Sequence, residues 1–215
     1  MSDKLLNLIN AERQKILTNW QRWDVPPVVA IENTSVLGPT YGGYEGRATH
    51  WIPLGKVSAT AAMVQVVGDL KSLWVDPKSS SYVEYYRTFL ADLFDVDATD
   101  LTKNFDIDHM YNRERAINFG YSYVRMFPIV KSANRSHGAG YEKAMTESDI
   151  GRRRKIMKLL DEVSTMKFFG VPSPRKSAAL TGVQQTHADN MAKMFDLSKE
   201  QIEEGISSLM ARANR

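Results

Sequence analysis

The sequence predicts an α+β fold that is mostly α-helical, and three observations predict it. Most of the 215 residues fall into segments whose apolar positions recur at helical spacing. Two short segments near the middle, 104–110 and 122–130, are instead rich in aromatic and β-branched residues, which favour strands. The composition, 43% hydrophobic and 25% charged, is typical of a globular chain and excludes disordered and collagen-like ones. We therefore expect helices around one pair of strands.

Residues 1–100 are predicted to form a helical N-terminal part. The first helix begins at the capping residues Ser2 and Asp3, buries an apolar face, and ends before Pro26. The stretch 28–54 is rich in glycine and is predicted to be loop with one or two short strands. The other helices expected in this part are 58–74 and 82–94.

The remaining residues divide into a central core and a helical C-terminal part. The two predicted strands lie in the core, 101–150, and the C-terminal part is 151–215. A capping box at Thr146 predicts a long helix to about residue 168, and Gly170 and the prolines after it end that helix. Two more helices are expected, over 180–195 and from a second capping box at Ser198 to about 211. We treat the whole chain, 1–215, as a single domain.

The charges of the chain are distributed unevenly. The net charge is +3, but residues 1–100 carry −3 and residues 101–215 carry +6, with the densest run at 152–155. A basic half is typical of proteins that bind a polyanion, although solvated helix faces carry similar runs. The chain has no cysteine, which excludes disulfides, thiolate zinc sites and thiol nucleophiles. Any chemistry must use oxygen and imidazole groups.

No segment approaches the roughly 20 consecutive apolar residues of a membrane span. The N-terminus carries charges where a signal peptide has an apolar run. We therefore expect synthesis in the cytoplasm, no signal peptide and no membrane partner.

The residues with the clearest chemical potential are Asp108 and His109, at the end of the first predicted strand. Adjacent strand residues point to opposite faces, so one side chain could hold a metal while the other acts as a base. Asn134 follows 25 residues later, a separation that suits a hairpin returning to start a helix. Carboxylate and amide oxygens suit Mg²⁺ or Mn²⁺. A lone Asp-His pair is also common as a structural ion pair at a strand end.

The segments Asp106-Ile-Asp-His109 and Asn134-Arg-Ser-His-Gly138 resemble the HNH, or ββα-metal, endonuclease family over about 40 residues. The resemblance implies a small ββα-metal hairpin–helix core embedded between helices. It also implies that Asp108 and Asn134 bind a divalent metal, that His109 is the general base, and that His137 is a further metal ligand or phosphate contact. The family usually has an asparagine near the start of the second strand, where this chain has Val124-Arg125, so what orients His109 stays open.

The resemblance implies a metal-dependent endonuclease that hydrolyses phosphodiesters of DNA rather than RNA, with low sequence specificity. The basic residues expected to contact nucleic acid are Arg125, Lys131, Arg135, Lys143, Arg152, Arg153 and Arg154. The chain is also similar to bacterial antagonistic toxin nucleases, which are delivered into other cells and restrained by an immunity protein. The alternatives are a non-catalytic helical nucleic-acid-binding or phage-associated protein and an interaction module for an acidic protein; the sequence leaves the oligomeric state open. His50 and His187 are interpreted as structural.

Overall fold

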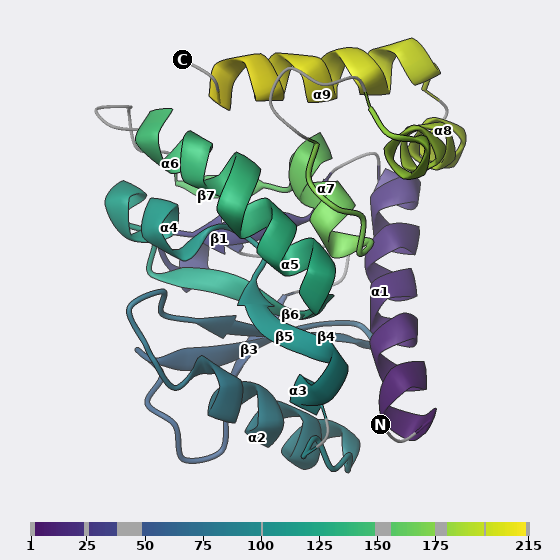
Figure 1. Ribbon diagram of the computed structural model, residues 1–215. Coiled ribbons are helices and arrows are strands. Elements are labelled where there is room, and N and C mark those ends of the chain that lie inside the picture. Colours follow the sequence, from purple (N-terminus) through teal and green to yellow (C-terminus); the bar gives the residue numbers. More distant parts are fainter. Residues whose placement is uncertain are drawn as a thin grey trace. The chain divides into compact units, whose positions relative to one another are not determined.

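The computed structural model describes residues 3–23, 26–37, 49–99, 101–148, 156–174, 180–195 and 197–213 (Figure 1). The helices are α1 (Asp3–Trp23), α2 (Tyr82–Phe94), α3 (Leu101–Asn104), α4 (Arg113–Phe119), α5 (Lys131–His137), α6 (Lys143–Ser148), α7 (Glu162–Phe168), α8 (Gly182–Phe195) and α9 (Lys199–Ala213), with a 3-10 turn η1 (Thr34–Leu37) and a π-helical segment η3 (Gly138–Glu142). The strands are β1 (Val28–Ile31), β2 (His50–Pro53), β3 (Ala62–Val67), β4 (Leu70–Val75), β5 (Phe105–His109), β6 (Tyr123–Val130) and β7 (Met157–Leu159).

Residue contacts divide the chain into two compact units. Unit 1 comprises Met1–Pro128 with Arg154–Leu159, and unit 2 comprises Ile129–Arg153 with Leu160–Arg215. Unit 1 holds the sheet, and the helices of unit 2 follow from the last residues of β6 onward. The predicted site residues Asp108 and His109 therefore belong to unit 1, whereas Asn134 and His137 belong to unit 2.

The predicted fold class is wrong in its central feature. In place of a small ββα core between helices, seven strands of the described residues form one curled sheet with the order β2-β3-β4-β6-β1-β7, and β5 also pairs with β6. The pairings β2–β3, β3–β4, β4–β6, β6–β1 and β1–β7 are antiparallel. The fold is mixed α+β, and the two strands expected from the sequence are part of a much larger sheet.

The largest single error is the helix predicted over 58–74, which is the β3–β4 hairpin. A continuous apolar run fits a buried strand as well as a buried helix, so its periodicity does not decide between them. Gly68 decides it: its φ of 56° lies in the left-handed region, and it turns the chain so that Val67 pairs with Leu70. Both strands of the hairpin are mostly buried.

Strand β6 is the centre of unit 1. It pairs with β4 on one side and β1 on the other, through Val75↔Val124 and Ile31↔Tyr123. Six of its eight residues are buried, as expected for a strand covered on both faces. Trp74, which is fully buried and donates from Nε1 to Gln65 Oε1 at 3.0 Å, anchors the adjoining core. That core cluster consists of Val28, Ile31, Leu37 and Trp74, with Val36, Trp51, Tyr123, Met157 and Leu159 packed against it.

Two helices of unit 1 agree with the prediction. In α1 the side chains of Leu5, Ile9, Ile16 and Trp20 are buried, and the helix contacts β4. Helix α2 lies against the lower part of the sheet in Figure 1 and contacts β4 and β5. It ends at Asp95, whose φ of 51° gives a left-handed C-cap.

Unit 2 is helical, but the long helix predicted over 146–168 is wrong. Helix α6 already begins at Lys143, and β7 occupies 157–159 of the same stretch before α7 begins. Asp161 caps α7 by accepting from Ser164 N at 2.8 Å. The predicted capping box at Ser198 is confirmed, because Ser198 and Gln201 exchange side-chain-to-backbone hydrogen bonds of 2.8 and 3.2 Å. None of the described helices is long and apolar enough to cross a membrane.

Candidate functional site

Asp108 and His109 close strand β5, and the strand gives them different environments. Burial alternates along β5, so Phe105, Ile107 and His109 are buried while Asp106 and Asp108 are half-buried. This is the two-residue period of a strand with one covered face. The His109 side chain is only 2% exposed, and that of Asp108 is 25% exposed.

The His109 ring is enclosed within unit 1. It packs on Tyr82 of α2 with ring centroids 5.0 Å apart. Its Nδ1 lies 3.9 Å from Asp108 Oδ1. The next residue, Met110, donates its backbone N–H to the carbonyl of Arg125 on β6 at 2.9 Å, which fixes the end of β5 against β6. The end of β5 thus offers a carboxylate at the surface and an imidazole beneath it.

Asn134 and His137 lie on α5 in unit 2. Asn134 is half-buried in the first turn, and His137 is fully buried one turn later. The His137 Nε2 atom lies 3.0 Å from the Val171 carbonyl oxygen, which ties α5 to the segment after α7. The structure therefore brings the predicted residues together in two pairs, Asp108 with His109 and Asn134 with His137, one pair in each unit.

The residues predicted to contact nucleic acid differ sharply in exposure. Arg125 is 3% exposed and donates to Ser72 Oγ at 2.6 Å inside the sheet, because β6 is covered on both faces. In this position Arg125 is not presented to a phosphate. Arg135 and Lys143 are exposed, and Lys131 is half-buried. Arg152, Arg153 and Arg154 lie outside the described residues.

The oxygen donors on β5 suit a hard divalent cation. Asp106 and Asp108 stand on the same face of the strand, two residues apart, and both are half-buried. Carboxylate oxygens with completing water molecules are the ligands that Mg²⁺ prefers. Among the described residues, no group of three or more histidine, aspartate or glutamate side chains is placed to hold a metal ion. The fit therefore rests on the carboxylates of β5 in unit 1.

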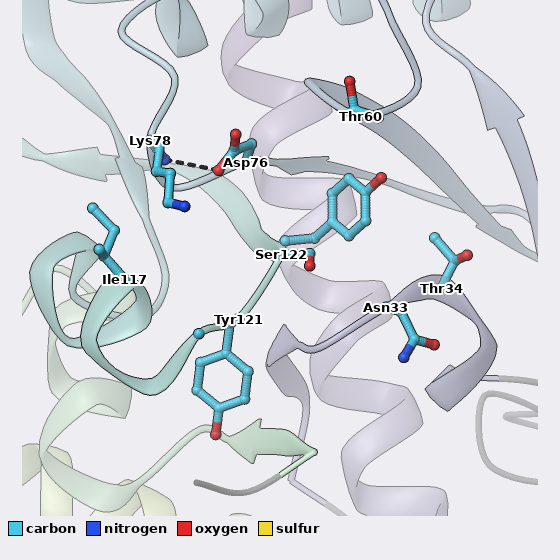
Figure 2. Close-up of a pocket in the computed structure, with 10 residues that line it drawn as sticks. Asn33, Thr34, Thr60, Asp76, Lys78, Ile117, Tyr121 and Ser122 are labelled. Carbon is cyan, nitrogen blue, oxygen red and sulfur yellow. Dashed lines mark hydrogen bonds between the residues drawn. The ribbon is translucent and has the colours of Figure 1, made fainter. Parts of the chain in front are cut away.

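A second feature, which the sequence did not predict, is a pocket in unit 1 with a volume of about 370 Å³. It lies at the edge of the sheet that is formed by the ends of strands. Because β6 is antiparallel to β1 and to β4, the ends of β1 and β4 meet the beginning of β6 there. Figure 2 shows Lys78, Asp76 and Ile117 on one side of it and Asn33 and Thr34 on the other. Asn33, Asp76 and Lys78 follow strand ends, whereas Ile117 lies in α4, and turn-forming residues such as Asp76-Pro77 were the signal of this region in the sequence.

The charged side of this pocket is held in place by backbone contacts. Asp76 Oδ1 accepts from the Lys78 backbone N–H at 2.9 Å, closing a turn after β4 (Figure 2). Arg113 of α4 donates to the carbonyl of Pro77 at 2.6 Å, so the turn is braced from the other side. Asp76 is half-buried, whereas Lys78 is exposed.

Tyr123 also lines the pocket and is fixed at both ends. Its ring packs against the core of unit 1, and its hydroxyl donates to the Ala59 carbonyl at 2.7 Å. Burial raises the pKa of the Tyr123 phenol above its ordinary value of 10.0, and the Asp76 carboxylate raises it further. The phenol therefore stays protonated at neutral pH and keeps its hydrogen bond.

Comparison with known proteins identified no relative of this chain. No protein-family model, no curated protein and no solved structure matches it. The HNH resemblance accordingly rests on the motif residues of the chain itself, and we carry it forward as a proposal.

Proposed function

We propose that this protein is a metal-dependent endonuclease that hydrolyses phosphodiester bonds, in DNA rather than RNA and with low sequence specificity. One observation supports the proposal most strongly. Asp108 and His109 close a strand that pairs with β6, and β6 continues directly into the helix that carries Asn134. This is the chain order in which the HNH motif presents its metal ligands and its base, here within a seven-stranded sheet.

The roles follow from the chemistry of each group. His109 takes a proton from the attacking water, whose oxygen forms a bond to phosphorus while the bond to the leaving sugar oxygen breaks. The leaving oxygen takes up a proton from solvent. Asp108, with Asp106 on the same face of β5, would hold Mg²⁺ or Mn²⁺, and such an ion would supply charge stabilisation to the phosphate and the leaving oxygen. Arg135 and Lys143, which are exposed, contact backbone phosphates and so carry little sequence information.

The resemblance to antagonistic toxin nucleases extends the proposal to a partner. A nuclease that harms its own host requires an inhibitor, and we propose a tight-binding immunity protein for this role. Co-purification with the product of a neighbouring open reading frame, followed by loss of cleavage in the complex, is the corresponding test.

A second candidate is favoured by burial. His109 is 2% exposed and Arg125 is 3% exposed, as is typical of residues with a structural role. These values favour a non-catalytic nucleic-acid-binding or interaction protein in which the Asp-His pair stabilises the end of β5. Such a protein binds DNA with a steep salt dependence and does not cleave it.

Plasmid cleavage separates the two candidates. Purified protein is incubated with supercoiled plasmid and Mg²⁺ or Mn²⁺, with and without a chelator. The nuclease converts the plasmid to nicked and linear forms only when metal is free. Asp108→Asn should lose this activity, whereas Asp69→Asn, an exposed aspartate in the β3–β4 turn of the same unit, should keep it. Binding without metal-dependent cleavage selects the second candidate.

A further inference from the structure

The pocket at the edge of the sheet places an anionic and a cationic group side by side. Asp76 and Lys78 lie two residues apart on the same side of it (Figure 2). Within the described part of the chain, no ion pair engages the Lys78 ammonium, and the Asp76 carboxylate accepts a single hydrogen bond, from a backbone N–H, at Oδ1. The pair therefore presents free carboxylate lone pairs next to an ammonium donor.

This arrangement discriminates among the nucleic-acid bases. The Watson–Crick edge of guanine presents two adjacent N–H donors, at N2 and N1, followed by the O6 acceptor. A carboxylate can accept both donors at once, and a neighbouring ammonium can donate to O6. Adenine and cytosine each offer one amino donor beside acceptors, and uracil and thymine place a single donor between two acceptors. Guanine alone has two adjacent donors followed by an acceptor, so it can make three hydrogen bonds to a carboxylate and a neighbouring ammonium where the other bases make two.

The rest of the lining suits a planar base attached to a sugar phosphate. Tyr123 supplies an aromatic ring that its contacts hold rigid, and bases stack on such rings when they leave the helical stack. Ile117, 37% exposed, adds an apolar surface at the rim. The Asn33 and Thr34 side chains, on the opposite side, offer neutral hydrogen-bonding groups to a sugar (Figure 2). A volume of about 370 Å³ lies within the range of pockets that hold small ligands, about 300 to 1,000 Å³.

We propose that this pocket binds a guanine base, with Asp76 accepting from N1–H and N2–H, Lys78 donating to O6, and Tyr123 packing on the ring. The inference rests on the proposed function insofar as the guanine belongs to the nucleic acid that is cut. It assigns the nuclease an unpaired guanine near the cleavage site as a preferred substrate feature. A free guanosine nucleotide presents the same edge, so the experiment must distinguish the two sources.

The test measures binding to the full chain by calorimetry in the presence of a chelator, so that no cleavage occurs. The ligands are the 5′-monophosphates of guanosine, inosine, adenosine, cytidine and uridine. Inosine is the sharpest probe because its base keeps N1–H and O6 but lacks the N2 amino group. We expect guanosine to bind tightest, inosine about tenfold more weakly and the other three more weakly still. This order is measured on the unaltered protein, so it does not depend on how any variant folds. Equal binding of all five nucleotides overturns the proposal.

Asp76→Asn supplies the matched variant. The amide oxygen can still accept the Lys78 N–H that closes the turn, but the side chain can no longer accept two hydrogen bonds from guanine. Guanosine affinity should fall about 10- to 100-fold. Asp69→Asn, an exposed change outside the pocket, should leave it unaltered. An Asp76→Asn protein with the correct circular dichroism spectrum and full guanosine affinity contradicts the assignment.

Two single-stranded oligonucleotides identify the source of the base. One is an all-thymidine strand and the other carries a single central guanosine. Tighter binding of the guanosine strand, lost in Asp76→Asn, supports a nucleic-acid ligand. Binding of the mononucleotide without discrimination between the strands overturns the substrate inference. Plasmid cleavage is measured separately. Cleavage without any guanine preference contradicts only the guanine inference, and guanine binding without cleavage contradicts only the nuclease proposal.

Discussion

The histidines of the two units are used differently. In unit 1, His109 packs against an aromatic ring next to a half-exposed carboxylate, with Nδ1 3.9 Å from Asp108. In unit 2, His137 and His187 are also buried, but their contacts differ: His137 lies 3.0 Å from a backbone carbonyl, and His187 packs on Phe169 with centroids 5.1 Å apart. An imidazole whose nitrogen is committed to a backbone carbonyl stabilises the fold, whereas one beside a carboxylate can exchange a proton. The proposed function therefore uses His109 for chemistry, and the contacts of His137 and His187 fit structural roles.

The largest effect is expected for His109 in catalysis. His109→Gln keeps most of the side-chain volume against Tyr82 but removes the base, so plasmid cleavage should fall about 10² to 10⁴-fold. His50→Ala, which alters an exposed histidine on β2 of the same unit, is the control and should cleave normally. Full activity in His109→Gln would place the base elsewhere and remove the distinction between the units.

The next effect is on stability and concerns His137. His137→Ala leaves a cavity and removes the partner of the half-buried Val171 carbonyl, which should lower the free energy of unfolding by about 3 to 4 kcal/mol. Urea unfolding followed by circular dichroism measures this loss. Tryptophan fluorescence is unsuitable, because all four tryptophans lie in residues 20–74 and report on unit 1. Arg135→Ala, an exposed change on the same helix, should cost less than about 0.5 kcal/mol. A similar cost for both variants would mean that His137 does not stabilise unit 2.

The pH dependence of unit 2 tests the third histidine. Burial lowers the pKa of His187 from 6.5 to about 4, so between these values the unfolded chain binds more protons than the folded one. The contribution of His187 to the free energy of unfolding is fully present above pH 6.5. It should fall by up to about 3 kcal/mol as the pH drops to 4. His187→Leu should flatten the stability profile in this window, as measured by urea unfolding at several pH values. An unchanged slope in the variant would show that other groups set it.

The smallest effect concerns the exposed basic side chains of unit 2. Removing one phosphate contact lowers the slope of log K against log salt by about 0.9. Lys143→Ala and Arg135→Ala should each show this change in fluorescence-anisotropy titrations with DNA, about equally for unrelated sequences. Arg125→Lys serves as a contrast, because Arg125 is buried against Ser72 and should leave the salt slope unaltered. An unaltered slope in both surface variants would leave the motif residues as the only support for nucleic-acid binding.

Several elements could be predicted from local signals. The helices α1, α2, α8 and α9 and the strands β5 and β6 lie close to their predicted ranges, because each has a regular apolar period and clear end signals. The Ser198 capping box formed as the sequence indicates because both of its hydrogen bonds are local.

Other features depended on contacts that no local pattern contains. Residues 58–74 are apolar enough for a buried helix or a buried strand, and pairing of β3 with β2 and of β4 with β6 determined the strand. The same sheet buried Arg125, whose charge alone suggested a surface position. The pocket combines residues from five segments between Asn33 and Tyr123 that only the sheet brings to one edge. The sequence by itself determined the local elements and the Asp108-His109 motif, whose signals lie within a few residues. Only the tertiary structure decided the sheet, the burial of each charged group and the pocket, because long-range pairing determines which polar groups reach water.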